Sequence, residues 1–564
     1  MVDLKSKPFN LNDQGISWVK STIAGMTTEE KIGQLFFNLF FDFKPETCKE
    51  IVDKYHIGGA RYMGATAEDV YGLTSNLQSL SKIPMLVACN CDSGGDGACK
   101  DGTYIASGAQ VEASGSEDVA YNVGYVSGRE ATAIGCNWNF DPCGDILFNW
   151  RNTIVNTRAY GTEIEPVIKY TSAYIRGLRQ SNIASCIKHF PGDGSEERDQ
   201  HLVLGVNELS CEEWDASYGE VYRHAIDEGV MTVMTGHIAL PEYQKKLKPG
   251  IKYEEILPAS LAPELITGLL REQLGFNGVV ITDASHMLGM TASMKRRDYV
   301  PAAIAAGCDM FLFFKDPEED FGFMMDGYKN GIITEERLND AMLRILGLKA
   351  ALKLHIKQKE GTLIPDKKVL EVVGCQEHLE MAEEAADLGI TLVKNTLNEL
   401  PIRPETHKRI KLHTLYGEIG GMFGATKASE KIIIEELEKV GFEVTLHDGT
   451  ELSMGKTAEY SKKWDAAILF ADIVGYASEN NYRLRWKAPM SSDIPWYVYE
   501  IPTVFVSLNF TTHLTDVPMV KTYINAYKNS RTVIRQVIQK MMGDSEFKGS
   551  YNENVWCNKW ETRR

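Results

Sequence analysis

The sequence predicts an α/β protein in which a (β/α)8 barrel of the TIM type is followed by a smaller three-layer α/β sandwich domain. Between residues 30 and 350, eight short β-rich runs alternate with amphipathic helical stretches. Eight strand–helix units in roughly 320 residues fit the size of a TIM barrel. A second alternation of the same kind begins after residue 385. From periodicity alone, a doubly wound open sheet is the alternative for the first part.

Each predicted barrel strand is a short apolar run bounded by polar or turn-forming residues. The eight runs are 35–39, 59–63, 85–88, 137–140, 184–187, 231–234, 279–282 and 309–313. Between them, helical periodicity is clearest at 117–134, 165–180 and 261–274. Because helices follow several of these strands, we expect parallel strands joined by right-handed crossovers.

A stretch rich in Lys and Glu separates the two alternations and contains Gly361 and Pro365. We therefore expect a barrel domain over 1–355, a linker over 356–385 and a C-terminal domain over 386–564. Five strands are predicted in the C-terminal domain, at 390–393, 410–415, 443–446, 466–470 and 503–506, with a helix at 432–440. This alternation predicts the sandwich.

A basic, aromatic loop at 482–487 lies in the predicted C-terminal domain. Arg483 and Trp486 are side chains that can stack on a sugar or bind an anion. The alternatives are a solvated loop and a contact between domains.

The composition limits the classes of partner. The chain has 60 Lys and Arg residues against 77 Asp and Glu residues, so its formal net charge is −17. Such a surface disfavours nucleic acid or an anionic membrane as the partner. No run approaches the roughly 20 apolar residues of a membrane span, and the first ten residues do not resemble a signal peptide. The 11 cysteines show no paired CxxC spacing, which favours reduced thiols and a cytoplasmic location. The oligomeric state is left open.

Polar residues follow the predicted barrel strands at the points where those strands end. In a parallel barrel, catalytic groups collect at these carboxyl ends. The residues concerned are Asn90 after the third strand, Lys188, His189, Asp199 and His201 after the fifth, His237 after the sixth, and Asp283 after the seventh.

Two of these positions favour acid–base or nucleophilic chemistry. Asp283 ends a nearly all-apolar strand, where a carboxylate loses hydration unless it has partners. The alternative role for Asp283 is to cap the next helix. The spacing of Asp199 and His201 allows a hydrogen bond that would fix the histidine tautomer and raise its basicity. The alternative is a solvated loop, since 195–199 is a charged stretch.

A metal site is a further alternative, with nitrogen and oxygen ligands from His189, Asp193, His201 and His237. The spacing matches neither HExxH nor a paired cysteine motif. The glycine-rich loops at 94–95 and 192–194 lack the patterns that cradle phosphate. We therefore expect no metal and no cofactor.

Taken together, these residues resemble glycoside hydrolase family 3, and in particular its β-N-acetylglucosaminidase-like branch. The most specific match is KHFPGDG at 188–194, followed after four residues by Asp199-x-His201. GVVITD at 278–283 is similar to the family's nucleophile strand, and NTRAYG at 156–161 is similar to its arginine segment. The resemblance covers roughly residues 15–350, and over the second domain it is architectural only.

The resemblance implies roles for individual residues. Asp283 would be the nucleophile, and His201 the general acid/base oriented by Asp199. Four side chains would bind sugar hydroxyls, namely Asn90, Arg158, Lys188 and His189. The chain departs from the family at two places: Asn90 stands where an aspartate is usual, and Asp193 replaces the histidine of a Gly-His-Gly segment.

We therefore expect a retaining, exo-acting β-glycoside hydrolase that acts on a small carbohydrate, first of all a β-N-acetylglucosaminidase. Asn90 lacks the charge of the usual aspartate, so a β-glucosidase stays open. A neutral imidazole does not repel an anion as a second carboxylate would, so a β-glycoside phosphorylase stays open too. A catalytically silent sugar-binding protein is the alternative from another class, and a metal-dependent hydrolase is a third.

Overall fold

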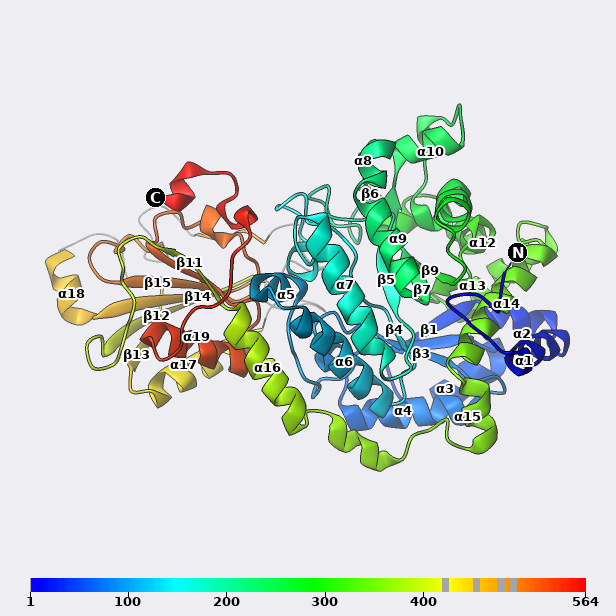
Figure 1. Ribbon diagram of the computed structural model, residues 1–564, viewed down its shortest axis with the longest axis horizontal. Coiled ribbons are helices and arrows are strands. Elements are labelled where there is room, and N and C mark those ends of the chain that lie inside the picture. Colours follow the sequence, from blue (N-terminus) through cyan, green and yellow to red (C-terminus); the bar gives the residue numbers. More distant parts are fainter. Residues whose placement is uncertain (1, 418–425, 450–456, 474–481, 487–493) are drawn as a thin grey trace. The chain divides into compact units, whose positions relative to one another are not determined.

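The computed structural model describes residues 2–417, 426–449, 457–473, 482–486 and 494–564 (Figure 1). The chain forms two compact units. The first comprises Met1–Tyr104, Ala120–Ile146 and Glu163–Leu379. The second comprises Ile105–Val119, Leu147–Thr162 and Glu380–Arg564. Two segments inside the predicted barrel domain, 105–119 and 147–162, thus belong to the second unit. The boundaries at 355 and 385 stay a prediction about domains.

The first unit is built on a parallel sheet of eight strands in the order β4-β3-β2-β1-β10-β9-β7-β5. Its strands are β1 (Phe36–Phe40), β2 (Gly59–Tyr62), β3 (Leu86–Cys89), β4 (Trp138–Asn139), β5 (Cys186–Phe190), β7 (Thr232–Thr235), β9 (Val279–Ala284) and β10 (Met310–Leu312). A parallel bridge between Trp138 and Ala184 links the two ends of this order. The sheet is therefore a nearly closed barrel, and the predicted TIM-like fold is confirmed.

Helices surround these strands, and Figure 1 shows α4, α6, α7 and α9 among them. The helices of this unit are α1 (Asp13–Ala24), α2 (Thr28–Gln34), α3 (Pro45–Tyr55), α4 (Ala67–Leu80), α6 (Glu117–Ala133), α7 (Ile164–Arg179), α8 (Cys211–Asp215), α9 (Tyr218–Glu228), α10 (Pro241–Leu247), α11 (Leu288–Thr291), α12 (Arg296–Ala306), α13 (Pro317–Lys329), α14 (Glu335–Ala351) and α15 (Leu354–Glu360). Helix α7 illustrates the cause: Val167, Tyr170, Tyr174 and Leu178 recur every three or four residues and are buried. The predicted helix at 261–274 is a π-helix, Glu264–Gln273.

A second, two-stranded parallel sheet lies beyond the carboxyl ends of β5 and β7. It pairs β6 (Gly205–Val206) with β8 (Ile238–Ala239). The chain between β5 and β6 is the segment that contains Asp199 and His201, so this small sheet fixes the far end of that loop.

The second unit contains a six-stranded sheet in the order β11-β16-β15-β14-β12-β13. Its strands are β11 (Thr391–Asn395), β12 (Arg409–Tyr416), β13 (Glu443–Leu446), β14 (Ala466–Asp472), β15 (Thr503–Ser507) and β16 (Thr522–Asn525). All neighbours are parallel except β11 and β16. The sequence predicts five of these strands and misses β16, although its residues Thr-Tyr-Ile are typical of a strand.

The helices of the second unit are α5 (Gly108–Ser114), α17 (Ala428–Lys439), α18 (Tyr460–Lys463) and α19 (Arg531–Met542), and α16 (Gln376–Gly389) begins before the boundary. Figure 1 shows α17 and α19 side by side, and the two helices are in contact. One face of the sheet, which carries Leu469 and Phe505, packs into an apolar cluster with Trp150, Phe510 and Trp556.

The loop at 482–487 makes contacts within the second unit. Arg483 Nε donates a 2.7 Å hydrogen bond to Asp516 Oδ1, and Trp486 Nε1 donates to the Asp516 carbonyl at 3.1 Å. Lys487 lies outside the described residues. These bonds give the loop a structural role in its own unit. Across the described part of the chain, every helix is too short or too polar to cross a membrane.

Candidate active site

Asp283 lies at the carboxyl end of β9, one residue before the strand stops. The Ala284 N–H donates a 2.7 Å hydrogen bond to Asp283 Oδ1. Burial raises the pKa of this carboxyl, but attraction to His189, His237 and His201 outweighs burial and lowers the pKa overall. Asp283 is therefore ionised at neutral pH, which is the state that a nucleophile requires.

The alternative role of Asp283, capping the next helix, does not occur. Helix α11 begins at Leu288, and its N-cap position is occupied by Met287. Asp283 thus lies four residues too early in the chain to satisfy the first N–H groups of that helix.

Asp199 and His201 form a hydrogen-bonded pair on the loop between β5 and β6. His201 Nδ1 lies 2.6 Å from Asp199 Oδ1, and the His201 backbone N–H donates to the same oxygen at 2.8 Å. A carboxylate can only accept, so Nδ1 carries a proton and Nε2 is the atom left to exchange one. The Asp199 side chain is fully buried, whereas 23% of the His201 side chain is exposed. The pair therefore presents a histidine that is held at one end and accessible at the other.

His237 follows β7 and is held beside Asp283. Its Nε2 lies 3.0 Å from the Ala284 carbonyl, and its Nδ1 lies 2.8 Å from Ser260 Oγ. A carbonyl oxygen can only accept, so Nε2–H donates to Ala284. Burial lowers the pKa of His237. Through its bonds to Ser260 and the Ala284 carbonyl, the His237 ring holds the end of the strand that carries Asp283.

A second Asp–His pair, Asp145 with His189, is buried at the ends of β4 and β5. His189 Nδ1 lies 2.7 Å from Asp145 Oδ2, and Asp145 Oδ1 accepts the backbone N–H groups of His189 and Asp193 at 3.1 and 2.8 Å. Burial raises the pKa of Asp145, but the charge and hydrogen bond of His189 lower it well below its usual range. The pair sets the orientation of His189 and ties down the start of the loop at Asp193.

Lys188 is buried between two carboxylates. Its Nζ lies 2.7 Å from Asp141 Oδ1 and 3.4 Å from Asp92 Oδ1. Burial and the charge of Asp92 raise the pKa of Asp141, and Lys188 opposes that shift. Asn90 follows β3 two residues before Asp92, and its Oδ1 is a buried acceptor with no hydrogen-bond donor among the described residues. Such an arrangement offers both donors and acceptors to a hydroxylated ligand.

The sequence interpretation missed Asp141 and Asp145. Both follow the predicted strand at 137–140, in the segment Asp-Pro-Cys-Gly-Asp, so the rule that found Asp283 also applies to them. Asp92 stands in a segment that the interpretation noted without assigning it a role, and His237 is considered there only as a possible metal ligand.

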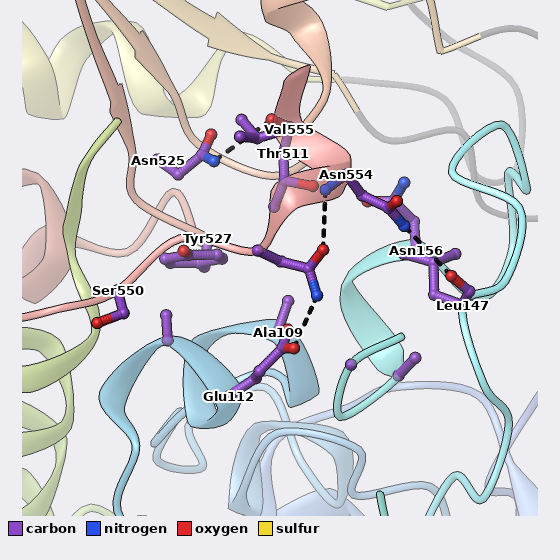
Figure 2. A pocket seen from close by; sticks show the side chains of 14 residues that line it. Ala109, Glu112, Leu147, Asn156, Thr511, Asn525, Tyr527, Ser550, Asn554 and Val555 are labelled. Atoms are coloured by element: carbon purple, nitrogen blue, oxygen red, sulfur yellow. Dashed lines mark hydrogen bonds between the residues drawn. The ribbon is translucent and has the colours of Figure 1, made fainter. Parts of the chain in front are cut away.

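Arg158 belongs to the second unit, where it ends the short 3-10 helix Asn156–Arg158 and is half-buried. That unit has a small pocket of its own, which Figure 2 shows. Asn156 and Asn525 line it, and Asn552 Nδ2 donates to Glu112 Oε1 at 2.8 Å. The volume open to the centre of a water molecule is only about 20 Å³, enough for one or two waters. The pocket is therefore too small for a sugar ring.

Among the described residues, one group at the barrel rim has ligand atoms close enough together to hold a metal ion. It consists of Cys143, Asp145 and His189, all buried. A second group, Cys375, Glu377 and His378, lies elsewhere in the chain. His201 and His237 are in neither group, so the described structure does not assemble the zinc set considered as an alternative above.

The rim thus combines an ionised carboxylate, an accessible histidine with a fixed tautomer, and a buried cluster of hydrogen-bonding groups. These are the parts needed to attack an anomeric carbon, protonate a leaving oxygen and hold sugar hydroxyls. The geometry supports double displacement at a glycosidic bond.

Comparisons with known proteins agree with this chemistry. Residues 27–348 match the family model described as the glycosyl hydrolase family 3 N terminal domain. The chain is 39% identical to a beta-N-acetylglucosaminidase/beta-glucosidase of Cellulomonas fimi, with the whole of both chains covered. The structure is similar to that of the beta-glucoside phosphorylase BglX, with 37% identity, a TM-score of 0.93 and 99% of each chain covered.

A more distant structure shares the fold. It is a glycoside hydrolase family 3 beta-N-acetylglucosaminidase from Paenibacillus sp. str. FPU-7, with 23% identity, a TM-score of 0.78, and 93% of this chain and 98% of that chain covered. The family match spans more than half of the chain and includes Asp283 and His201. This chain therefore belongs to glycosyl hydrolase family 3.

Proposed function

We propose that this chain is a retaining, exo-acting β-glycosidase in which Asp283 is the nucleophile and His201 is the general acid/base. The observation that carries the proposal is the accessible Asp199–His201 pair on the loop after β5, together with the ionised Asp283 at the end of β9. A retaining enzyme needs a carboxylate to trap the anomeric carbon and an acid for the leaving oxygen. Here an imidazolium supplies the proton in place of a second carboxylic acid.

In the first step, Asp283 attacks the anomeric carbon and a covalent glycosyl ester forms. The bond from that carbon to the leaving oxygen breaks, and the proton on His201 Nε2 passes to this oxygen. His201 is then neutral, while Asp199 keeps the proton on Nδ1 and so holds the ring orientation.

In the second step, neutral His201 takes a proton from water as the water oxygen attacks the anomeric carbon. The ester bond to Asp283 breaks and the carboxylate is restored. Two inversions at the same carbon give net retention.

The glycone is held by the buried cluster next to this machinery. Carboxylates orient Lys188 and His189 through a salt bridge and a hydrogen bond, respectively. Asn90 Oδ1 is a buried acceptor that can receive a hydrogen bond from a sugar hydroxyl. Arg158 is proposed as a further hydroxyl ligand on the strength of its sequence motif alone. A hydroxylated ring of the size of a hexose satisfies such a set of groups.

As substrate we propose a β-linked N-acetylglucosaminide first and a β-glucoside second. The Cellulomonas fimi relative carries both activities in its name, which supports both sugars as candidate substrates. A panel of aryl β-glycosides tests it: the ratio of kcat/KM for the two sugars decides the glycone, and no turnover of either contradicts the proposal.

Phosphorolysis is the second candidate, favoured by the likeness to the phosphorylase BglX. After the first step a neutral His201 faces the ester, and phosphate meets less repulsion there than it would beside a carboxylate. Phosphate would attack the anomeric carbon and release a glycosyl phosphate. Turnover in phosphate buffer, with the product identified by mass spectrometry, separates the two acceptors.

The nucleophile is tested by Asp283→Asn, for which we expect kcat to fall by at least about 10⁴-fold because the ester cannot form. A 2-fluoro sugar with an activated leaving group should label the native protein by the mass of one glycosyl group. The label should lie on the peptide that contains Asp283. A variant that keeps native turnover, or a label on another peptide, would contradict the assignment.

A cytoplasmic location remains a proposal, supported by eleven cysteines that are all free thiols in the structure. Thiol titration of the denatured protein, purified without reductant from its native source, should count eleven.

A further inference from the structure

Gln200, the residue between Asp199 and His201, spans two separate parts of the barrel rim. Its side chain is almost fully buried, with 1% exposed. Gln200 Nε2 donates to Asp193 Oδ2 at 3.3 Å, and Gln200 Oε1 accepts the His237 backbone N–H at 2.6 Å. One amide therefore connects the start of the loop with the segment after β7.

The backbone at Gln200 is also anchored. The Gly289 N–H donates to the Gln200 carbonyl at 3.3 Å, and the Leu288 N–H donates to the His201 carbonyl at 3.0 Å. These donors follow β9, the strand that carries Asp283. The peptide that carries His201 is thus tied on one side to the nucleophile strand and on the other to β7.

The amide reaches its partners because a glycine leaves the space. A Cβ at Gly236 would lie 3.1 Å from Gln200 Oε1 and 3.1 Å from His189 Cβ. Both contacts are tighter than ordinary van der Waals distances, so a larger residue would push the amide or the His189 ring out of place. The loop between Asp193 and Gln200 is charged and partly exposed.

We propose that Gln200 is a positioning residue, whose amide bridge from Asp193 to the His237 backbone holds the Asp199–His201 pair in register with Asp283. This inference rests on the proposed function and deepens it. A proton donor displaced by about 1 Å loses on the order of 10²-fold in rate, so a single bridge of this kind is enough to control the acid step.

Gln200→Met tests the bridge with little change in volume, because methionine keeps the unbranched chain and removes the amide. We expect kcat for an aryl glycoside with a poor leaving group to fall about 10- to 100-fold. For an activated aryl leaving group, which needs no acid, we expect a loss of at most about threefold. KM for the glycone should change little, since the sugar-binding cluster stays in place.

A swapped pair distinguishes positioning from general damage. In Gln200→Glu, two carboxylates face each other, and the leaving-group-dependent loss should persist. Adding Asp193→Asn restores a donor and an acceptor with their roles exchanged, since the introduced amide can donate to the introduced carboxylate. The double variant should recover most of the rate on the poor leaving group.

Gln78→Met is the matched control. Gln78 is a buried glutamine whose amide also bridges backbone groups, donating to the Met85 carbonyl at 2.9 Å and accepting the Met85 N–H at 3.0 Å. It lies at the opposite end of the barrel strands, before β3. Its substitution should lower the melting temperature without changing the ratio of rates on the two leaving groups.

The inference is overturned if Gln200→Met slows both substrates equally, or if the swapped pair fails to recover the rate while remaining folded by circular dichroism. Failure of the proposed function looks different. In that case His201→Ala itself shows no dependence on the leaving group, whatever happens at Gln200.

Discussion

The barrel unit contains two Asp–His pairs with almost the same hydrogen bond and different surroundings. In each, Nδ1 of the histidine lies close to a buried carboxylate, at 2.7 Å for Asp145–His189 and 2.6 Å for Asp199–His201. The histidine of the first pair is part of strand β5, with 7% of its side chain exposed. The histidine of the second stands on a loop, with 23% of its side chain exposed.

The difference separates two uses of one motif. A general acid must reach a leaving group that enters from solvent and departs again, so one face of its ring has to be accessible. A buried pair cannot exchange protons freely, but it can hold a ring in one orientation against a substrate hydroxyl. Hydrogen-bond geometry therefore does not identify the catalytic pair. Exposure of the ring to solvent differs between the two pairs, and it favours Asp199–His201 as the proposed acid/base pair.

The largest expected effect is on the rate, where the two histidines should differ in how strongly their loss depends on the leaving group. His201→Ala should lower kcat by about 10³-fold on a poor leaving group and far less on an activated one, because only the former needs a proton. His189→Ala should raise KM and slow both substrates in parallel, since it loses a sugar contact. The measurement is the rate on a series of aryl glycosides of graded leaving-group pKa. If log kcat falls with leaving-group pKa at the same slope in both variants, the two pairs do not differ in role.

For the free energy of unfolding, the buried Asp145–His189 pair should matter more than the exposed Asp199–His201 pair. Asp145→Asn breaks a buried pair and leaves two backbone donors with a weaker acceptor, so we expect a loss of about 3 kcal/mol in the free energy of unfolding. Asp199→Asn should cost about 1 kcal/mol, since its histidine can turn to solvent. Urea unfolding at neutral pH compares the variants.

The cost of Asp145→Asn should also depend on pH. The folded-state pKa of Asp145 is lowered, so its contribution is fully present above about pH 4 and is lost as pH falls through the folded value. The difference in the free energy of unfolding between the native protein and Asp145→Asn should therefore become smaller below about pH 4. A gap that widens in acid would mean that Asp145 is not ionised in the folded state.

The smallest effect concerns His237, the third histidine near Asp283, which is held by a hydroxyl and a carbonyl. Ser260→Ala removes the bond to Nδ1 and should cost about 1 kcal/mol of stability. We expect kcat to change by less than about threefold, because the bond to the Ala284 carbonyl remains. Thermal melts and steady-state rates test both figures. A tenfold loss of kcat would place His237 in the chemistry rather than beside it.

Much of the fold could be predicted from the sequence because local patterns determine it. Apolar runs and turns predict the eight barrel strands, and the positions of Asp283 and His201 after such strands mark both as candidates. The β16 strand is short and follows a loop, so its Thr-Tyr-Ile run was lost among irregular residues. The transfer of 105–119 and 147–162 to the second unit depends on contacts distant in sequence, which no local period reveals.

In the site, too, contacts between residues near in sequence could be predicted and contacts between distant residues could not. Asp199 and His201 are two residues apart, and their spacing predicts the hydrogen bond that the structure contains. The partners of Asp145 and Gln200 lie 44 and 37 residues away, at His189 and His237. Such pairs are set by the closure of the barrel, so the sequence could name the candidates only through the strand-end rule, and it gave no sign of the Gln200 bridge.

The central claim, that the exposed pair and not the buried one supplies the acid/base, is tested most directly by chemical rescue with azide. In His201→Ala, azide needs no base to attack the glycosyl ester on Asp283, so we predict that azide restores turnover of an activated aryl glycoside and yields the β-glycosyl azide. In His189→Ala, azide should change nothing. Rescue of His189→Ala alone, or an α-configured azide from His201→Ala, would contradict the account.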